Sequence, residues 1–81
     1  MKAIIRAGNV TRGLYIFENS DGEYGYFELL DGTDLEKDDV LIGDFTALAG
    51  ETVRKADTGE LLDIYIEDYC SLSVARDRIF G

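Results

Sequence analysis

The sequence contains no histidine, no tryptophan and no proline, and its one cysteine is Cys70. Without histidine there is no Ser-His or Cys-His pair to activate a nucleophile, and no imidazole ligand for zinc. A single cysteine supplies neither an internal disulfide nor a thiolate cluster. Cys70 precedes a predicted helix but has no visible base, so we interpret it as a small packed residue. We therefore expect a non-catalytic protein without a metal or a cofactor.

Long apolar runs are also missing. No stretch approaches the roughly 20 apolar residues that a transmembrane helix needs. The N-terminal sequence "MKAIIRAGN" lacks the apolar region of a signal peptide. We therefore expect a cytoplasmic protein that does not bind membranes, and its 81 residues fit one small domain, residues 1–81.

Positive charge is scarce. Eight Lys and Arg residues stand against 17 Asp and Glu residues, which gives a net charge of −9. This charge repels polyanions at long range, and proteins that bind single strands gain much of their affinity from many Lys and Arg contacts. Tight nonspecific binding of nucleic acid is therefore disfavoured. No acid precedes Glu18, however, so Lys2, Arg6 and Arg12 form a local basic region.

The two acidic runs, residues 18–23 and 31–39, contain oxygen ligands that suit calcium. Neither run has the spacing of an EF-hand loop. Charged residues mostly stay exposed to solvent. We therefore interpret both runs as solvated loops.

Alternation of apolar and polar residues is what the sequence does have, and this period of two marks β-strands. The alternation is clearest from Leu62 to Ile66. The "NSDG" sequence at 19–22 predicts a hairpin turn, because Asn, Asp and Gly tolerate unusual backbone angles. Gly25 and Gly43 predict bulges or close backbone approaches. We predict strands at residues 2–7, 14–18, 23–30 and 40–48, and a hairpin over 51–68 around "DTG".

Two segments predict helical structure instead. Thr33 and Glu36 form a minimal capping box, which predicts one helical turn near 33–38. Ser71 is a suitable N-cap for a C-terminal helix over 71–80. The residues at helical spacing that we expect to dock on the sheet are Leu72, Ala75, Ile79 and Phe80.

These elements predict a mainly β fold, a small five- to six-stranded antiparallel OB-like barrel. The helical turn then falls between the third and fourth strands, and the C-terminal helix follows the last strand. An SH3-like barrel is the alternative. Closure of the barrel is physically favourable because it removes exposed sheet edges.

The segments "RGLYIF" (12–17) and "GYFELL" (25–30) resemble the two aromatic motifs of cold-shock domains, which are OB-fold proteins. In that family the motifs read Lys-Gly-Phe-Gly-Phe-Ile and Val-Phe-Val-His-Phe, and their rings stack on single-stranded nucleic acid. The Arg-Gly start of the first segment matches in type, and Phe27 falls on the first phenylalanine of the second motif. Leu14 and Ile16 replace two phenylalanines of the first motif. The resemblance covers less than half of the chain and implies an OB-like fold and nucleic-acid binding.

The aromatic residues between 13 and 27 allow two interpretations. An exposed platform would stack on bases, at about 1–3 kcal/mol per base. Alternatively the rings form cross-strand pairs and fill the core, which a chain without tryptophan also requires. The candidate binding face consists of Arg6, Arg12, Tyr15, Phe17, Tyr24, Tyr26 and Phe27.

We expect this chain to be a small acidic binding module that acts through protein–protein contacts with an unidentified partner. Its contact surface would consist of the acidic loops and Tyr24, Tyr26 and Tyr65, because tyrosine is enriched at interfaces. The alternative is a cold-shock-like protein that binds single-stranded nucleic acid weakly through the candidate binding face. A third interpretation is that the acidic body mimics nucleic acid. The sequence leaves the oligomeric state open.

Overall fold

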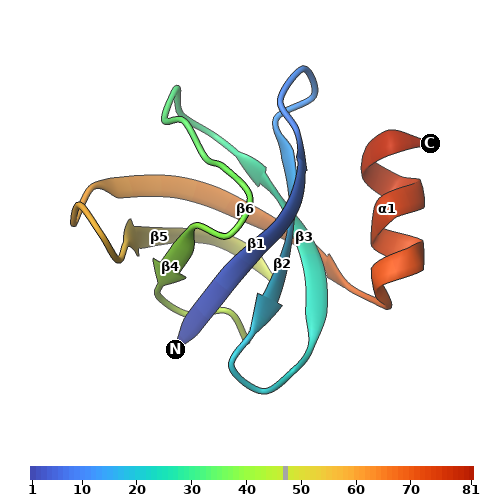
Figure 1. Ribbon diagram of the computed structural model, residues 1–81, viewed down its shortest axis with the longest axis horizontal. Helices are drawn as coiled ribbons and strands as arrows, with labels where there is room; N and C mark the ends of the chain where they lie inside the picture. The colour runs from blue at the N-terminus through green and yellow to red at the C-terminus, as the bar shows by residue number, and fades with distance from the viewer. Residues whose placement is uncertain (47) are drawn as a thin grey trace.

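The computed structural model describes residues 1–46 and 48–81, which form a β-barrel and one helix (Figure 1). The strands close in the order β1-β2-β3-β6-β5-β4, and all neighbouring pairs are antiparallel. This confirms the predicted mainly β architecture, with six strands, and the barrel is consistent with an OB-like fold. The elements are β1 (Lys2–Asn9), β2 (Leu14–Asn19), β3 (Tyr24–Leu29), β4 (Val40–Ile42), β5 (Ala49–Lys55), β6 (Leu61–Tyr69) and α1 (Leu72–Phe80).

Alternating side chains build the core inside the barrel. Along β6, Leu62, Ile64 and Ile66 are at most 1% exposed, whereas the residues between them face solvent. Inward residues of the other strands complete one hydrophobic cluster, which includes Phe17 and Phe27. The period of two in the sequence therefore becomes an inside and an outside of the barrel.

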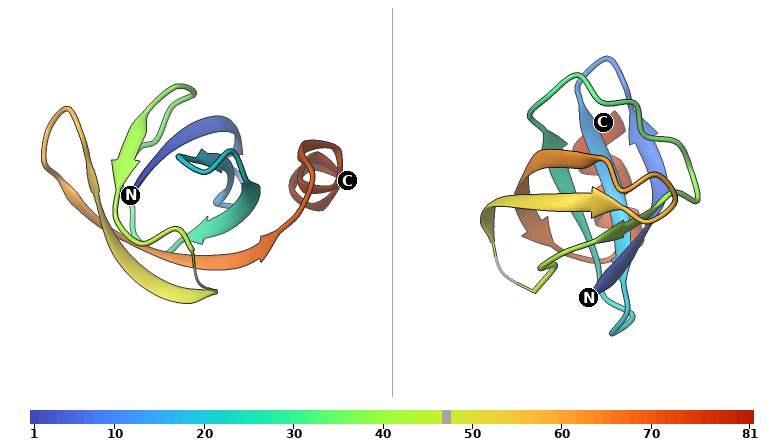
Figure 2. Two further views of the ribbon diagram at one scale, coloured as in Figure 1. Left: turned by 90° about the horizontal axis from the view of Figure 1, so that it is seen from below. Right: turned by 90° about the vertical axis from the view of Figure 1, so that its left-hand side faces the viewer.

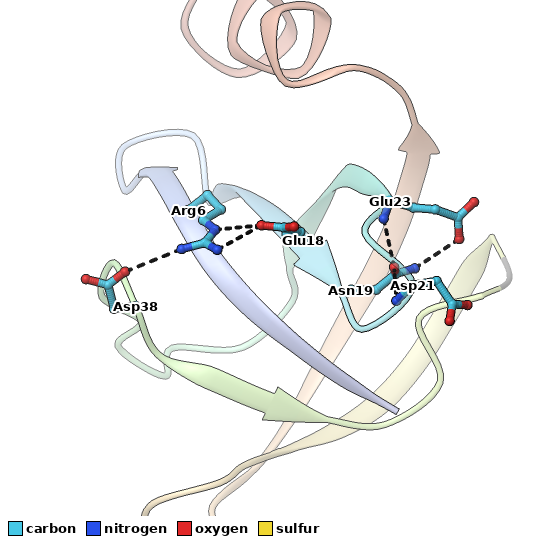
Figure 3. Close-up of polar contacts among 6 residues, drawn as sticks. All are labelled: Arg6, Glu18, Asn19, Asp21, Glu23 and Asp38. Atoms are coloured by element: carbon cyan, nitrogen blue, oxygen red, sulfur yellow. Dashed lines mark hydrogen bonds and ion pairs between the residues drawn. The ribbon is translucent and has the colours of Figure 1, made fainter.

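The predicted turn at 19–22 is confirmed, and the side chain of Asn19 organises it (Figure 3). Its Oδ1 accepts hydrogen bonds from the backbone N–H groups of Asp21 and Glu23, both at 3.0 Å. Its Nδ2 donates to the Glu23 carboxylate and to the Phe45 carbonyl, both at 3.1 Å. Asn19 is only 4% exposed, so these bonds satisfy a buried polar group.

The predicted helical turn at 33–38 is wrong, because the backbone groups of this segment bond elsewhere. The N–H of Thr33 donates to the carboxylate of Asp31 at 2.9 Å. Asp38 adopts a positive φ of 75°, and its N–H donates to the carbonyl of Ile5 at 2.7 Å. The segment therefore ends alongside β1 and does not form a helical turn.

The strand predicted at 40–48 is shorter than expected, since β4 has only three residues. Gly43 follows it in close contact with β5, where an added Cβ would lie 2.5 Å from Cγ1 of Val53. The chain then turns so that Phe45 is fully buried in the core. Residue 47, which also belongs to that prediction, lies outside the described residues.

The C-terminal helix is confirmed, and Ser71 caps its N-terminus as predicted. Helix α1 packs on the outside of the barrel, against β1, β2 and β3 (Figure 2). Ala75 and Ile79 are buried in this contact, but Leu72 and Phe80 are 37% and 50% exposed. The prediction is therefore confirmed for Ala75 and Ile79 and wrong for Leu72 and Phe80.

Candidate interaction surface

The aromatic cluster of β2 and β3 divides between the inside and the outside of the barrel. Tyr15 is 4% exposed, and Phe17 and Phe27 are fully buried. The Phe27 ring stacks with both others, at centroid distances of 5.8 Å to Tyr15 and 6.0 Å to Phe17. The strand register explains this, because Tyr15 lies opposite Phe27 and residues opposite each other share one face. These three rings belong to the core and drop out of the candidate binding face.

Tyr24 and Tyr26 lie on the outer side of β3, where α1 partly covers them. Both are half-buried and pack against the cluster formed by Ile16, Ala75 and Ile79. The hydroxyl of Tyr26 also accepts a hydrogen bond from the guanidinium of Arg78, which lies in α1, at 3.2 Å. The two tyrosines therefore contact the helix and do not form an open stacking platform.

Carboxylates hold the guanidinium of Arg6 (Figure 3). Its Nε and Nη2 donate to Oε1 of Glu18 at 3.0 and 2.8 Å, and its Nη1 lies 3.9 Å from the carboxylate of Asp38. The hydrogen bond to Glu18 raises the pKa of Arg6. An incoming phosphate would have to compete with these carboxylates for Arg6.

Arg12 is also engaged within the chain, at the C-terminal end of α1. Its Nη1 donates to the carbonyl oxygens of Arg78 and Ile79, both at 3.2 Å. The last carbonyls of a helix have no partner within the helix, and a cation is favourable at that end. Arg6 and Arg12, two of the three cations of the basic region, therefore form intramolecular contacts. The candidate binding face is not one continuous surface.

Tyr65 is exposed on the outer side of β6. In the closed ring, β6 lies three strands away from β1. Tyr65 is 44% exposed. Glu28 of β3 lies opposite it on one side, and Gly50 of β5 lies opposite it on the other. The glycine, which has no side chain, lines a shallow hollow together with Asp63.

The surface around Tyr65 is acidic and partly apolar. Asp63 and Glu67 flank the tyrosine on the outward side of β6, and both are exposed. The apolar side chains of Leu30 and Leu61 are 55% and 66% exposed. We name this surface the Tyr65 face and define it by Glu28, Leu30, Gly50, Leu61, Asp63, Tyr65 and Glu67.

The sequence pattern identifies Tyr65 but not its neighbours. Alternation along residues 61–67 places Tyr65 on the outer side of a strand. Glu28 and Gly50 are distant in sequence, and they join the surface only because β6 pairs with both β3 and β5. A local pattern carries no information about that pairing.

Cys70, the one cysteine of the sequence, is not an activated nucleophile. Burial, followed by the charge of Asp68, raises the pKa of Cys70, which disfavours the reactive thiolate at neutral pH. Burial, together with nearby acidic charges, raises the pKa of Tyr69 to about 12. Within residues 1–46 and 48–81, no three His, Cys, Asp or Glu side chains are grouped so as to hold a metal ion. In the same residues, no helix has the length and apolarity to cross a membrane.

No family model matches the chain, and neither the curated proteins nor the solved structures provide a significant match. The resemblance to cold-shock domains therefore gains no support from relatives. The geometry of the chain itself carries the functional argument.

Proposed function

We propose that this chain is a non-catalytic binding module that acts through protein–protein contacts, with the Tyr65 face as its contact surface. The observation that carries the proposal is Tyr65 itself, which is 44% exposed on a regular sheet between acidic neighbours. Tyrosine offers rigid apolar area with a polar tip, which suits a contact residue.

The charge of the surface indicates the chemistry of the partner. Glu28 lies opposite Tyr65 on β3, and Asp63 and Glu67 lie two residues from it on β6, while Leu30 and Leu61 supply apolar area. A complementary protein segment carries Lys or Arg beside apolar side chains. Such charge pairs steer association and become weaker as salt rises.

The test is affinity capture from a lysate of the source organism, with three baits. Wild type, Tyr65→Ala and Phe80→Ala are compared; Phe80 is a matched control because it is an aromatic residue, 50% exposed, on α1. We expect a protein that wild type and Phe80→Ala retain and that Tyr65→Ala loses, because a central aromatic contact is worth about 2 kcal/mol or more. The captured protein should elute as salt rises. A set of captured proteins that is identical for all three baits contradicts the proposal.

Binding of single-stranded nucleic acid is the alternative, and its support is the pair Tyr24 and Tyr26 on the outside of the barrel. It is the weaker proposal, because Arg6 and Arg12 are engaged within the chain and three motif rings, Tyr15, Phe17 and Phe27, lie in the core. Titration of labelled single-stranded DNA and RNA at low salt distinguishes the two. Micromolar binding that Tyr26→Ala abolishes and Tyr65→Ala leaves intact would favour the alternative.

A further inference from the structure

The outer surface of the barrel beneath α1 carries apolar side chains, which α1 shields from solvent. Ile16 of β2 points out of the barrel, yet it is fully buried because Ala75 and Ile79 lie over it. Ala7 and Leu14 pack against the same cluster. Without the helix, these apolar side chains would form an exposed patch of the kind that marks an interaction site.

The same surface binds the end of a helix through its backbone. Asn9 donates from Nδ2 to the carbonyl of Ile79 at 2.6 Å, and Arg12 donates to the carbonyls of Arg78 and Ile79 at 3.2 Å. Every helix leaves its last carbonyls without an internal partner. Asn9 and Arg12 therefore recognise a feature common to all helix C-termini, whatever the side chains.

Arg78, a basic residue in the last turn of α1, contacts two side chains of the barrel. Nη1 of Arg78 donates to the Tyr26 hydroxyl at 3.2 Å and lies 3.8 Å from the carboxylate of Asp68. The apolar surface around Ile16 accepts a small and a branched apolar side chain four residues apart, which are Ala75 and Ile79 in α1. The surface thus specifies a short amphipathic helix with a basic C-terminal turn.

The interactions that hold α1 in place come from two buried side chains and its last turn. Ala75 and Ile79 are its only buried residues within the described chain. The ion pair of Arg78 with Asp68 joins side chains that are 54% and 45% exposed, and such pairs contribute little. The ladders that close the barrel run through the strands and do not include the helix. Undocking of the helix would therefore break none of the strand pairs that close the barrel.

We propose that the surface beneath α1 is a helix-binding site, and that α1 is a resident helix that exchanges for an amphipathic helix of a protein partner. This partner helix carries a small and a branched apolar residue four positions apart and an Arg or Lys in its last turn. The site shares no residue with the Tyr65 face, so its test is separate from that of the proposed function.

The first test measures exchange in trans. The full chain with Ile79→Asp is labelled with nitrogen-15, because a carboxylate cannot sit on this apolar surface and releases the resident helix. The probe is an acetylated peptide of residues 71–81 with the wild-type sequence, and the control is the same peptide with Ile79→Asp. We expect the wild-type peptide, at millimolar concentration, to shift the amide signals of Ala7, Ile16 and Tyr26, while the control peptide shifts none. An isolated helix this short is marginal in water, so weak binding is expected.

The wild-type chain serves as the second host for the same peptide. Its tethered α1 occupies the site at high effective concentration, so the peptide should bind at least about tenfold more weakly than to the variant. If the variant keeps the amide spectrum of the barrel and the wild-type peptide leaves those signals unmoved, the proposal is overturned. Equal binding of the two peptides overturns it as well.

Hydrogen exchange on the wild-type chain tests the proposal even if the variant does not fold. The N–H of Ala75 bonds to the carbonyl of Ser71 within α1, and Ile64 lies in the core strand β6. Exchange at Ala75 should be at least about tenfold faster than at Ile64, because local opening requires less free energy than global unfolding. Equal protection of the two amides would mean that α1 opens only when the barrel unfolds, and would refute the exchange.

Discussion

Nη2 of Arg6 lies 2.8 Å from Oε1 of Glu18, and the Nε of the same guanidinium donates to that oxygen at 3.0 Å. This pair links β1 to β2 on the outside of the barrel. Arg6, a candidate for nucleic-acid contact in the sequence, here pairs with a carboxylate of the neighbouring strand. The arginine is therefore a structural residue in this fold.

We expect the Arg6–Glu18 link to stabilise the fold slightly and to weaken in salt, because both side chains are partly exposed. A double-mutant cycle with Arg6→Met and Glu18→Gln, measured by urea unfolding, gives the coupling between them. The coupling should be favourable at low salt and close to zero at about 1 M salt, where screening acts within about 3 Å. A coupling that salt does not change would contradict this assignment.

Gly25→Ala should destabilise the protein by about 1–3 kcal/mol, the usual range for overpacking. A Cβ at Gly25 would lie 2.5 Å from the carbonyl oxygen of Asp68 and 2.8 Å from Cζ of Phe17. Gly50→Ala is the matched control in a neighbouring part of the sheet, because its added Cβ would meet nothing closer than 3.9 Å. Urea midpoints of both variants provide the measurement. Equal midpoints for the two variants would show that the sheet accommodates a Cβ at Gly25 without loss of stability.

Phe27→Ala should cost about 3–5 kcal/mol, which is the range for truncating a buried phenylalanine. Phe27 is fully buried and stacks with Tyr15 and Phe17. A small domain has a total stability of about 5–15 kcal/mol, so the variant should be close to unfolding. Tyr65→Ala, at an exposed position, should stay within about 0.5 kcal/mol of wild type. Thermal unfolding followed by circular dichroism separates these outcomes, and similar losses for both variants would place Phe27 outside the core.

Stability should fall as the pH rises above about 10, the ordinary pKa of tyrosine. Burial raises the pKa of Tyr69 in the folded chain to about 12. Between these two values the folded state keeps the phenol proton while the unfolded state loses it. The unfolded state then binds fewer protons, so the free energy of unfolding decreases with pH.

Urea midpoints between about pH 8 and pH 11 measure this decline for wild type and two variants. Tyr69→Phe should reduce the decline, because it removes one of the two phenols whose pKa burial raises, the other being Tyr15. Tyr65→Phe leaves Tyr69 in place and should retain it. A profile that is equally steep in Tyr69→Phe would assign the alkaline loss of stability to other groups.

The sequence predicts most of the fold because its strands alternate regularly. From Leu62 to Ile66 the pattern alone separates inside from outside, and "NSDG" defines its turn through local backbone chemistry. The segment at 33–38 is mispredicted because the capping-box pattern is local, whereas Asp38 bonds to Ile5, a residue far away in the chain.

The candidate site was harder to predict than the fold. The sequence places Tyr15 and Tyr26 in one aromatic cluster, but they are an odd number of residues apart on paired strands. The β2–β3 register sends the first into the core and the second outward. A tertiary contact also decides the role of Arg12, whose partners are carbonyls of α1 near the other end of the chain. Neither fact is encoded in the residues nearby.

The short strand β4 has a consequence for how the chain behaves in crowded or denaturing solution. Among the described residues it joins β5 through two residue pairs, Leu41 with Lys55 and Ile42 with Arg54, and these complete the ring. Breaking these two pairs leaves the other strands paired and opens the barrel into a sheet with two exposed edges. Each exposed edge presents unpaired backbone groups, with which a strand of a second chain would pair. Substitutions that weaken the β4–β5 pairs should therefore favour self-association of the chain.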